Sequence, residues 1–149
     1  MPTRLFALIT GLIYTIWGLM GFFAPFSWRP EMERLRNEFI SFHSHYFLGF
    51  IEANWPHDIL WLVMGLAGLA AFISFNTSAL YARGLFVVTV LLTLTGLMPL
   101  GIGSLWGFLP LFGWNVILHA VTAICAWYYG LVYPYEQRMP VRSPIHLPI

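Results

Sequence analysis

Long stretches without a charged residue are the feature that most limits how this chain can fold. No charged side chain occurs between Arg4 and Arg29, between Asp58 and Arg83, or between Arg83 and Glu136. The first two intervals have 24 residues each, enough for one helix across a hydrocarbon core that takes about 20 residues. Because 9% of all residues are charged, against roughly 25% in soluble proteins, most of the surface must face lipid.

The third uncharged interval has 52 residues and is too long for one crossing. A single helix of that length would measure about 78 Å, whereas the core of a bilayer is about 30 Å thick. Helix breakers lie in its middle, at Pro99, Gly101, Gly103 and Pro110. The sequence therefore predicts an all-α, polytopic membrane protein with helices at about 5–26, 57–77, 82–100 and 112–133, arranged as two tandem helical hairpins. The first apolar run is too long for the h-region of a signal peptide, so we expect a retained helix.

Two segments lie outside these helices. The first is an outer loop at about 27–56, where Met32, Leu35, Phe39 and Phe42 recur at helical spacing and predict an amphipathic helix on the membrane surface. The second is a proline-rich tail, 134–149, whose composition favours extended structure. We therefore expect a transmembrane domain at 1–133, and contacts with other membrane protein subunits through the outer loop and the tail.

The few charges indicate an orientation and exclude one class of partner. With the N-terminus inside, the inner flanks carry Arg4, Arg83, Arg138 and Arg142, against three arginines in the outer loop. The positive-inside rule then predicts that both termini are cytoplasmic. A net charge of +1 excludes electrostatic binding of nucleic acid. The single Cys125 excludes a disulfide framework.

An internal repeat relates the two predicted hairpins. The first and third helices align at an offset of 78 residues, and the second and fourth at an offset of 58, which places Trp61 on His119. Small residues recur along one face of the even helices, as in Gly65, Gly68 and Ala123. Because small side chains let helix backbones approach in a bilayer, we expect these faces to point inward.

The same segments resemble an uncharacterised bacterial membrane family, the domain of unknown function DUF4383. The resemblance covers about residues 5–133, and it is carried by Asn115-Val116-Ile117-Leu118-His119 and by the segment from His57 to Leu69. It implies a four-helix membrane protein, but no activity. The sequence departs from the family at Trp61, where a second histidine is frequent, and at Ala123, where glycine is usual.

His119 is the foremost candidate for chemistry, because the predicted topology places it inside the membrane. It is a candidate axial ligand for haem iron or for the magnesium of a (bacterio)chlorophyll, or a partner for a quinone, with Asn115 one turn away. The alternative is a hydrogen bond to another helix, with Asn115, Thr93 or Thr95 as partner.

A second candidate site is a metal centre in the outer loop. His43, His45 and His57 supply nitrogen ligands that could bind zinc or copper if the loop brought them together. No zinc-protease, phosphate-binding or nucleophile-elbow motif is present, so we expect a non-catalytic protein.

Two functions remain open from the sequence. One is an accessory or scaffold subunit of a larger bioenergetic or photosynthetic complex in a bacterial inner or photosynthetic membrane. The other is a membrane redox protein that binds haem, a pigment or a quinone through His119.

Overall fold

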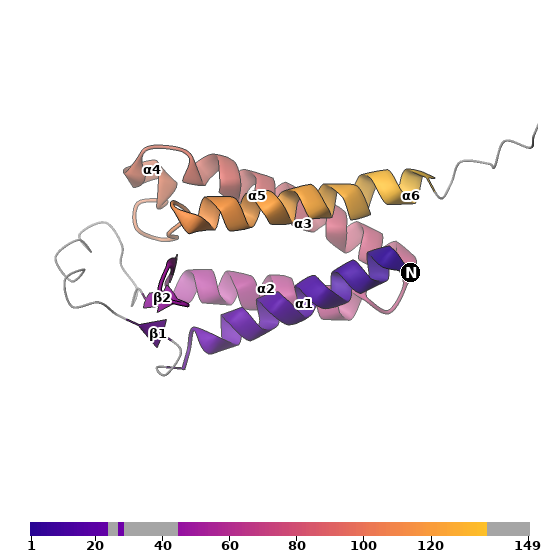
Figure 1. The fold of residues 1–149 in the computed structure, drawn as a ribbon, viewed down its shortest axis with the longest axis horizontal. Helices are drawn as coiled ribbons and strands as arrows, with labels where there is room; N and C mark the ends of the chain where they lie inside the picture. Colours follow the sequence, from indigo (N-terminus) through magenta and orange to yellow (C-terminus); the bar gives the residue numbers. More distant parts are fainter. Residues whose placement is uncertain (24–26, 29–44, 137–149) are drawn as a thin grey trace, which may run out of the picture.

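Four long helices lie side by side in the computed structural model, which describes residues 1–23, 27–28 and 45–136 (Figure 1). They pack as two hairpins, and the last helix continues through a π-helical turn into a short final helix. The elements are α1 (Pro2–Met20), α2 (Trp55–Ala71), α3 (Phe75–Gly96), α4 (Leu100–Gly103), α5 (Trp114–Trp127), η4 (Tyr128–Val132) and α6 (Tyr133–Glu136). The predicted hairpin arrangement therefore appears as α1 with α2 and α3 with α5.

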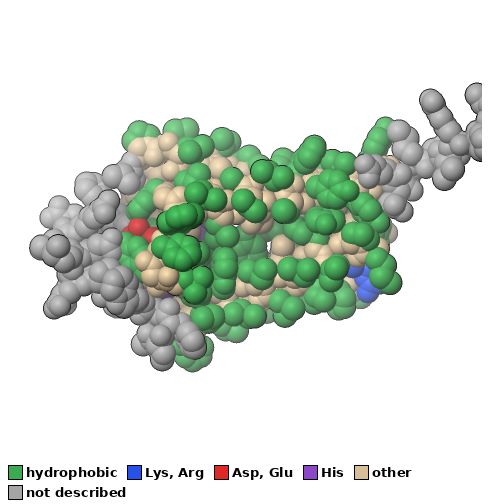
Figure 2. Space-filling view, viewed as in Figure 1, with side chains coloured by type: hydrophobic (Ala, Val, Ile, Leu, Met, Phe, Trp, Pro, Cys, Tyr) green, Lys and Arg blue, Asp and Glu red, His purple; other side chains and the backbone are tan. Residues whose placement is uncertain are grey.

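The helices present apolar side chains to their surroundings. Three segments are long and apolar enough to cross a membrane, namely Pro2–Met20, Phe75–Gly96 and Trp114–Tyr135. Figure 2 shows hydrophobic side chains along the length of the bundle, with arginines at the end where the chain begins. A soluble protein rarely exposes such a continuous apolar surface, so the chain is an integral membrane protein.

Glycines bring α1 and α2 into close contact. A Cβ atom at Gly11 would lie 2.7 Å from Leu69 N, and one at Gly18 would lie 2.6 Å from Leu62 N. On α2, a Cβ at Gly65 would overlap the backbone of Thr15. The prediction that these small-residue faces point inward is confirmed for this hairpin. The repeat that suggested it stays a prediction.

A small antiparallel sheet closes one end of the bundle (Figure 1). Its strands are β1 (Ser27–Trp28), β2 (His45–Phe47) and β3 (Ile51–Ala53), paired in the order β1-β2-β3. The turn between β2 and β3 has positive φ at Leu48 and at Gly49. The sequence did not predict this sheet. The predicted amphipathic helix falls on residues 29–44, outside the described part of the chain.

Helix ends follow the expected local chemistry. Asn54 caps α2, and Ser74 caps α3 by accepting a hydrogen bond from the backbone N–H of Thr77. At the C-terminal side, helical structure continues through Pro134 to Glu136, three residues past the predicted boundary. The rest of the tail, 137–149, lies outside the described residues.

Candidate functional site

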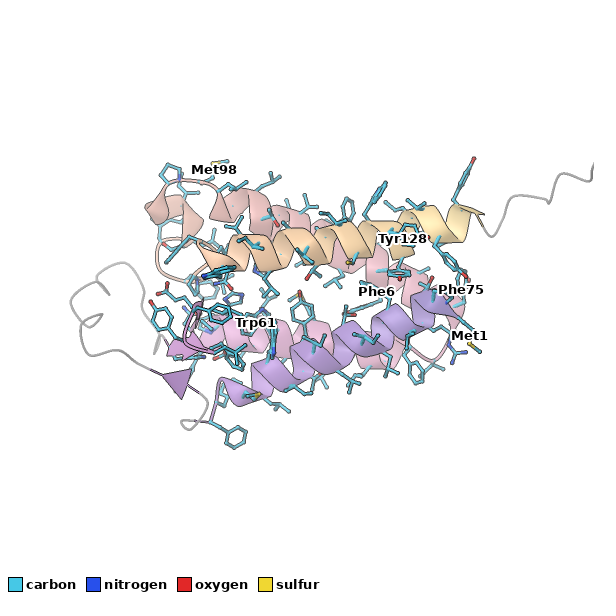
Figure 3. All side chains as sticks on the ribbon, viewed as in Figure 1. Met1, Phe6, Trp61, Phe75, Met98 and Tyr128 are labelled. Carbon is cyan, nitrogen blue, oxygen red and sulfur yellow. The ribbon has the colours of Figure 1, made fainter. Side chains whose placement is uncertain are left out.

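Two histidines face each other inside the bundle, next to the sheet. His57 is in the first turn of α2 and His119 in the second turn of α5, and both side chains are fully buried. Their ring centroids are 5.6 Å apart. The rings meet because α2 and α5 both begin at the sheet end and belong to different hairpins that pack together (Figure 1). Trp61, labelled in Figure 3, lies one turn further along α2, with its ring 4.4 Å from that of His57.

A close contact between a histidine and an aspartate lies beside the two histidines. His45 Nε2 of β2 is 3.4 Å from Asp58 Oδ1 of α2, and both side chains are buried. The Asp58 carboxyl group packs against Gly21 at the end of α1, where a Cβ atom would overlap it. Glu52, on the neighbouring strand β3, is 9% exposed. We call His45, His57, Asp58 and His119 the histidine centre.

Two asparagines tie the hairpins and the sheet together around this centre. Asn54 Oδ1 accepts a hydrogen bond from the backbone N–H of His57, and its Nδ2 donates to the carbonyl oxygen of Phe108 at 2.9 Å. Asn115 Nδ2 donates to the carbonyl oxygens of Glu52 and Pro110, both at 2.6 Å. These bonds fix the helix starts from which His57 and His119 project.

Several polar atoms at the centre have no hydrogen-bond partner among the described residues. They are both ring nitrogens of His57, both ring nitrogens of His119, Trp61 Nε1 and Asn115 Oδ1. Leaving one buried donor or acceptor unsatisfied costs about 1–3 kcal/mol. A stable bundle would not retain so many unsatisfied groups at one place unless water or a ligand completed them.

The predicted cofactor residues, His119 and Asn115, are both in this buried region. Asn115 has a structural task, because its amide nitrogen binds two backbone carbonyls. The predicted partners of His119 on α3 are wrong, since the hydroxyls of Thr93 and Thr95 donate to carbonyls of their own helix. A cavity of about 350 Å³ does lie between α3 and α5, but its lining is Phe86, Val90, Thr93, Leu94, Ala120, Ala123, Ile124 and Trp127, without His119.

The predicted metal residues are only partly brought together. His45 pairs with Asp58, His57 faces His119, and His43 lies outside the described residues. Within the described ranges, no three histidine, cysteine or acidic side chains form a set that could hold a metal ion.

Sequence reasoning missed the meeting of His57 with His119. The repeat alignment set Trp61 in the position equivalent to His119, and His57, although within possible reach, was interpreted first as part of the helix terminus. Trp61 is fully buried beside His57. A signal was available, because positions 57, 61, 64, 65 and 68 share one face of a helix and hold His, Trp, Met and two Gly.

Comparison with known proteins places the chain in a family. A family model described as a domain of unknown function, DUF4383, matches residues 4–132, which include the whole histidine centre. Searches of curated proteins and of solved structures found no match. The match covers most of the chain and agrees with the resemblance noted from the sequence. The protein therefore belongs to the DUF4383 family.

Proposed function

We propose that this chain crosses the membrane four times and that it takes up and releases protons at the histidine centre. The fourth crossing is α2, whose 17 residues make a helix of about 26 Å, close to the thickness of a hydrocarbon core. Its outward residues Ile59, Val63 and Leu66 are apolar and exposed, as a lipid-facing surface requires. Four crossings put both ends of the described chain on one side of the membrane.

Both termini face the cytoplasm in this proposal, and the membrane is a bacterial one. Arg4 lies in the first turn of α1 and Arg83 in the half of α3 nearest to the same end, whereas Glu52 and Asp58 lie at the sheet end. Because cytoplasmic flanks are rich in arginine, this distribution favours a cytoplasmic N-terminus and an outward-facing sheet.

The observation that carries the proton function is the buried pair of His57 and His119. An imidazole can accept a proton on one nitrogen and release another from the second, so two adjacent rings form a relay. Ionisable groups inside a membrane are costly and mark ion or proton pathways. The titratable groups next to the pair, among the described residues, include His45 from β2, which acts on His57, and Asp58 from α2, which contacts His45.

Selective ¹⁵N-histidine NMR in lipid nanodiscs tests this function directly. Between neutral and strongly acidic pH, the ring signals of His57 and His119 should change, and because the two rings lie close together the titration of one should affect that of the other. Single His57→Gln and His119→Gln variants assign the signals and should each alter the titration of the remaining ring. The proposal is wrong if both rings keep one protonation state throughout.

A second candidate function is the accessory or scaffold subunit expected from the sequence, and the cavity between α3 and α5 favours it. Its lining is apolar and includes the small residues Ala120 and Ala123, which would let a helix of another membrane protein approach closely. A complex larger than the 17.1 kDa chain should then survive mild detergent and be lost in Ala120→Trp. Purification of the wild type as a single chain would reject this candidate.

A further inference from the structure

Hydroxyl groups continue the polar interior from the histidine centre toward the arginine end of the bundle. Thr122 lies three residues after His119 on α5, which places it one turn deeper in the bundle. Its Oγ1 is hydrogen-bonded to the hydroxyl of Tyr14 on α1 at 2.8 Å. Tyr14 is a core residue, with 2% of its surface exposed.

A second hydroxyl pair extends the series by another turn. Thr10 lies four residues before Tyr14 on the same face of α1, and its Oγ1 is 3.3 Å from the hydroxyl of Tyr81 on α3. Tyr81 is the seventh residue of α3, about 9 Å along the helix from its first residue at the arginine end. Polar groups from α1, α2, α3 and α5 thus follow one another from the sheet end to within about two turns of the arginine end.

The spacing of these groups suits proton transfer with few waters. Direct hydrogen bonds join Thr122 to Tyr14, and Thr10 to Tyr81. The remaining steps, from His119 to Thr122 and from Tyr14 to Thr10, join residues three or four apart on one helix, whose Cβ atoms lie about 5–6 Å from each other. One water with two hydrogen bonds of about 2.8 Å spans that distance. The unpartnered nitrogens of His119 supply a place for the first such water.

We infer that the histidine centre is the outer half of a proton path that crosses the whole bundle. This inference rests on the proposed function and names its transported species, the proton. A proton enters at Asp58 and His45, passes through the imidazoles of His57 and His119, and leaves through the hydroxyls of Thr122, Tyr14, Thr10 and Tyr81. At each group one N–H or O–H bond forms as another breaks, so one positive charge moves and no residue is consumed.

A simpler role for the hydroxyls is adhesion between helices, since interhelical hydrogen bonds also stabilise membrane bundles. The two roles predict different consequences for removal of one hydroxyl. Loss of adhesion lowers stability without changing proton movement through the folded protein, whereas a break in a relay lowers the proton flux.

The test uses the full chain in vesicles that contain a pH-sensitive dye, with a potassium gradient and valinomycin to drive protons inward. Wild-type protein should acidify the vesicles faster than protein-free lipid does. Tyr14→Phe and Thr122→Val should each reduce the flux at least about tenfold, because each removes a group that must both accept and donate a proton. Thr95→Val is the matched control, because the Thr95 hydroxyl bonds to Leu91 of its own helix and lies outside the path.

The outcomes separate this inference from the proposed function. Titration of the histidine pair without vesicle acidification, or acidification that Tyr14→Phe and Thr122→Val leave unchanged, would overturn the transmembrane path while the proton-binding function stands. Histidines that do not titrate overturn the proposed function itself. The path is supported if Tyr14→Phe and Thr122→Val both lose the proton flux while Thr95→Val keeps the wild-type flux. All three variants must be folded to the same extent.

Discussion

At the scale of single residues, the buried polar side chains fall into two groups, those that make hydrogen bonds between elements and those that make none. Asn54 and Asn115 bind backbone carbonyls and clearly stabilise the junction of the two hairpins. His57 and His119, by contrast, make no hydrogen bond through their rings within the described part of the chain. Natural proteins accept such a loss of stability where function requires it.

The histidine pair should therefore be removable without loss of stability. Replacing two facing polar groups by apolar side chains of similar size is often neutral or stabilising. We expect the double variant His57→Leu with His119→Leu to unfold in detergent at the wild-type temperature or above it, while proton uptake is lost. A fall in the unfolding free energy of more than about 2 kcal/mol would instead show that the pair holds the helices together, as hydrogen bonds between helices do in membrane proteins.

At the scale of secondary-structure elements, contact between α1 and α2 depends on glycine. Gly65 faces the Thr15 backbone, whereas nothing lies within 4 Å of a Cβ atom at Gly84 of α3. Ala123 of α5 lines the cavity between α3 and α5. In the second hairpin, close backbone contact is instead made at Gly130, where a Cβ atom would lie 2.9 Å from the backbone nitrogen of Arg83.

A pair of glycine-to-alanine variants tests this difference. Gly65→Ala should lower the unfolding temperature in detergent, because the added methyl group must displace the α1 backbone. Gly84→Ala should raise it slightly, since alanine favours a helix over glycine by about 1 kcal/mol where there is room. Changes of the same sign in both variants would contradict the packing described here.

The sequence predicted elements better than it predicted their contacts. Uncharged intervals and the breakers Pro99 and Pro110 located α1, α5 and the end of α3, because lipid requires long apolar segments with satisfied backbones. The turn between α2 and α3 was predicted at 78–81 but lies at 72–74, because the uncharged interval that ends at Arg83 includes the start of α3. The pattern of small and polar residues indicates which faces of α2 and α5 point inward, but the meeting of His57 with His119 also requires that these two faces lie opposite each other, which a local pattern does not determine. The strands around His45 were missed because aromatic residues near a membrane surface also suit an interfacial segment.

At the scale of the whole molecule, the two ends of the bundle differ in charge and in construction. At one end Arg4 joins α1 to the end of α2, donating from Nε to the Phe72 carbonyl oxygen at 2.9 Å. Arg83 donates in the same way to Gly130, in the π-helical turn η4. The opposite end carries the sheet, α4 and the acidic side chains of Glu52 and Asp58 (Figure 1). A proton path between these ends requires that all four long helices cross the membrane.

Labelling of introduced cysteines decides whether α2 crosses. In a Cys125→Ser background, three variants each place one thiol at an exposed position: Leu48→Cys in the sheet turn, Ile73→Cys in the α2–α3 loop and Trp106→Cys in the loop before α5.

With four crossings, a membrane-impermeant maleimide added to intact cells should label positions 48 and 106. It should label position 73 only after the cells are permeabilised. If α2 did not cross, positions 48 and 73 would share a side and position 106 would lie opposite, because α3 crosses between them. Labelling of position 73 alone in intact cells would preserve four crossings and reverse the orientation that the arginines favour.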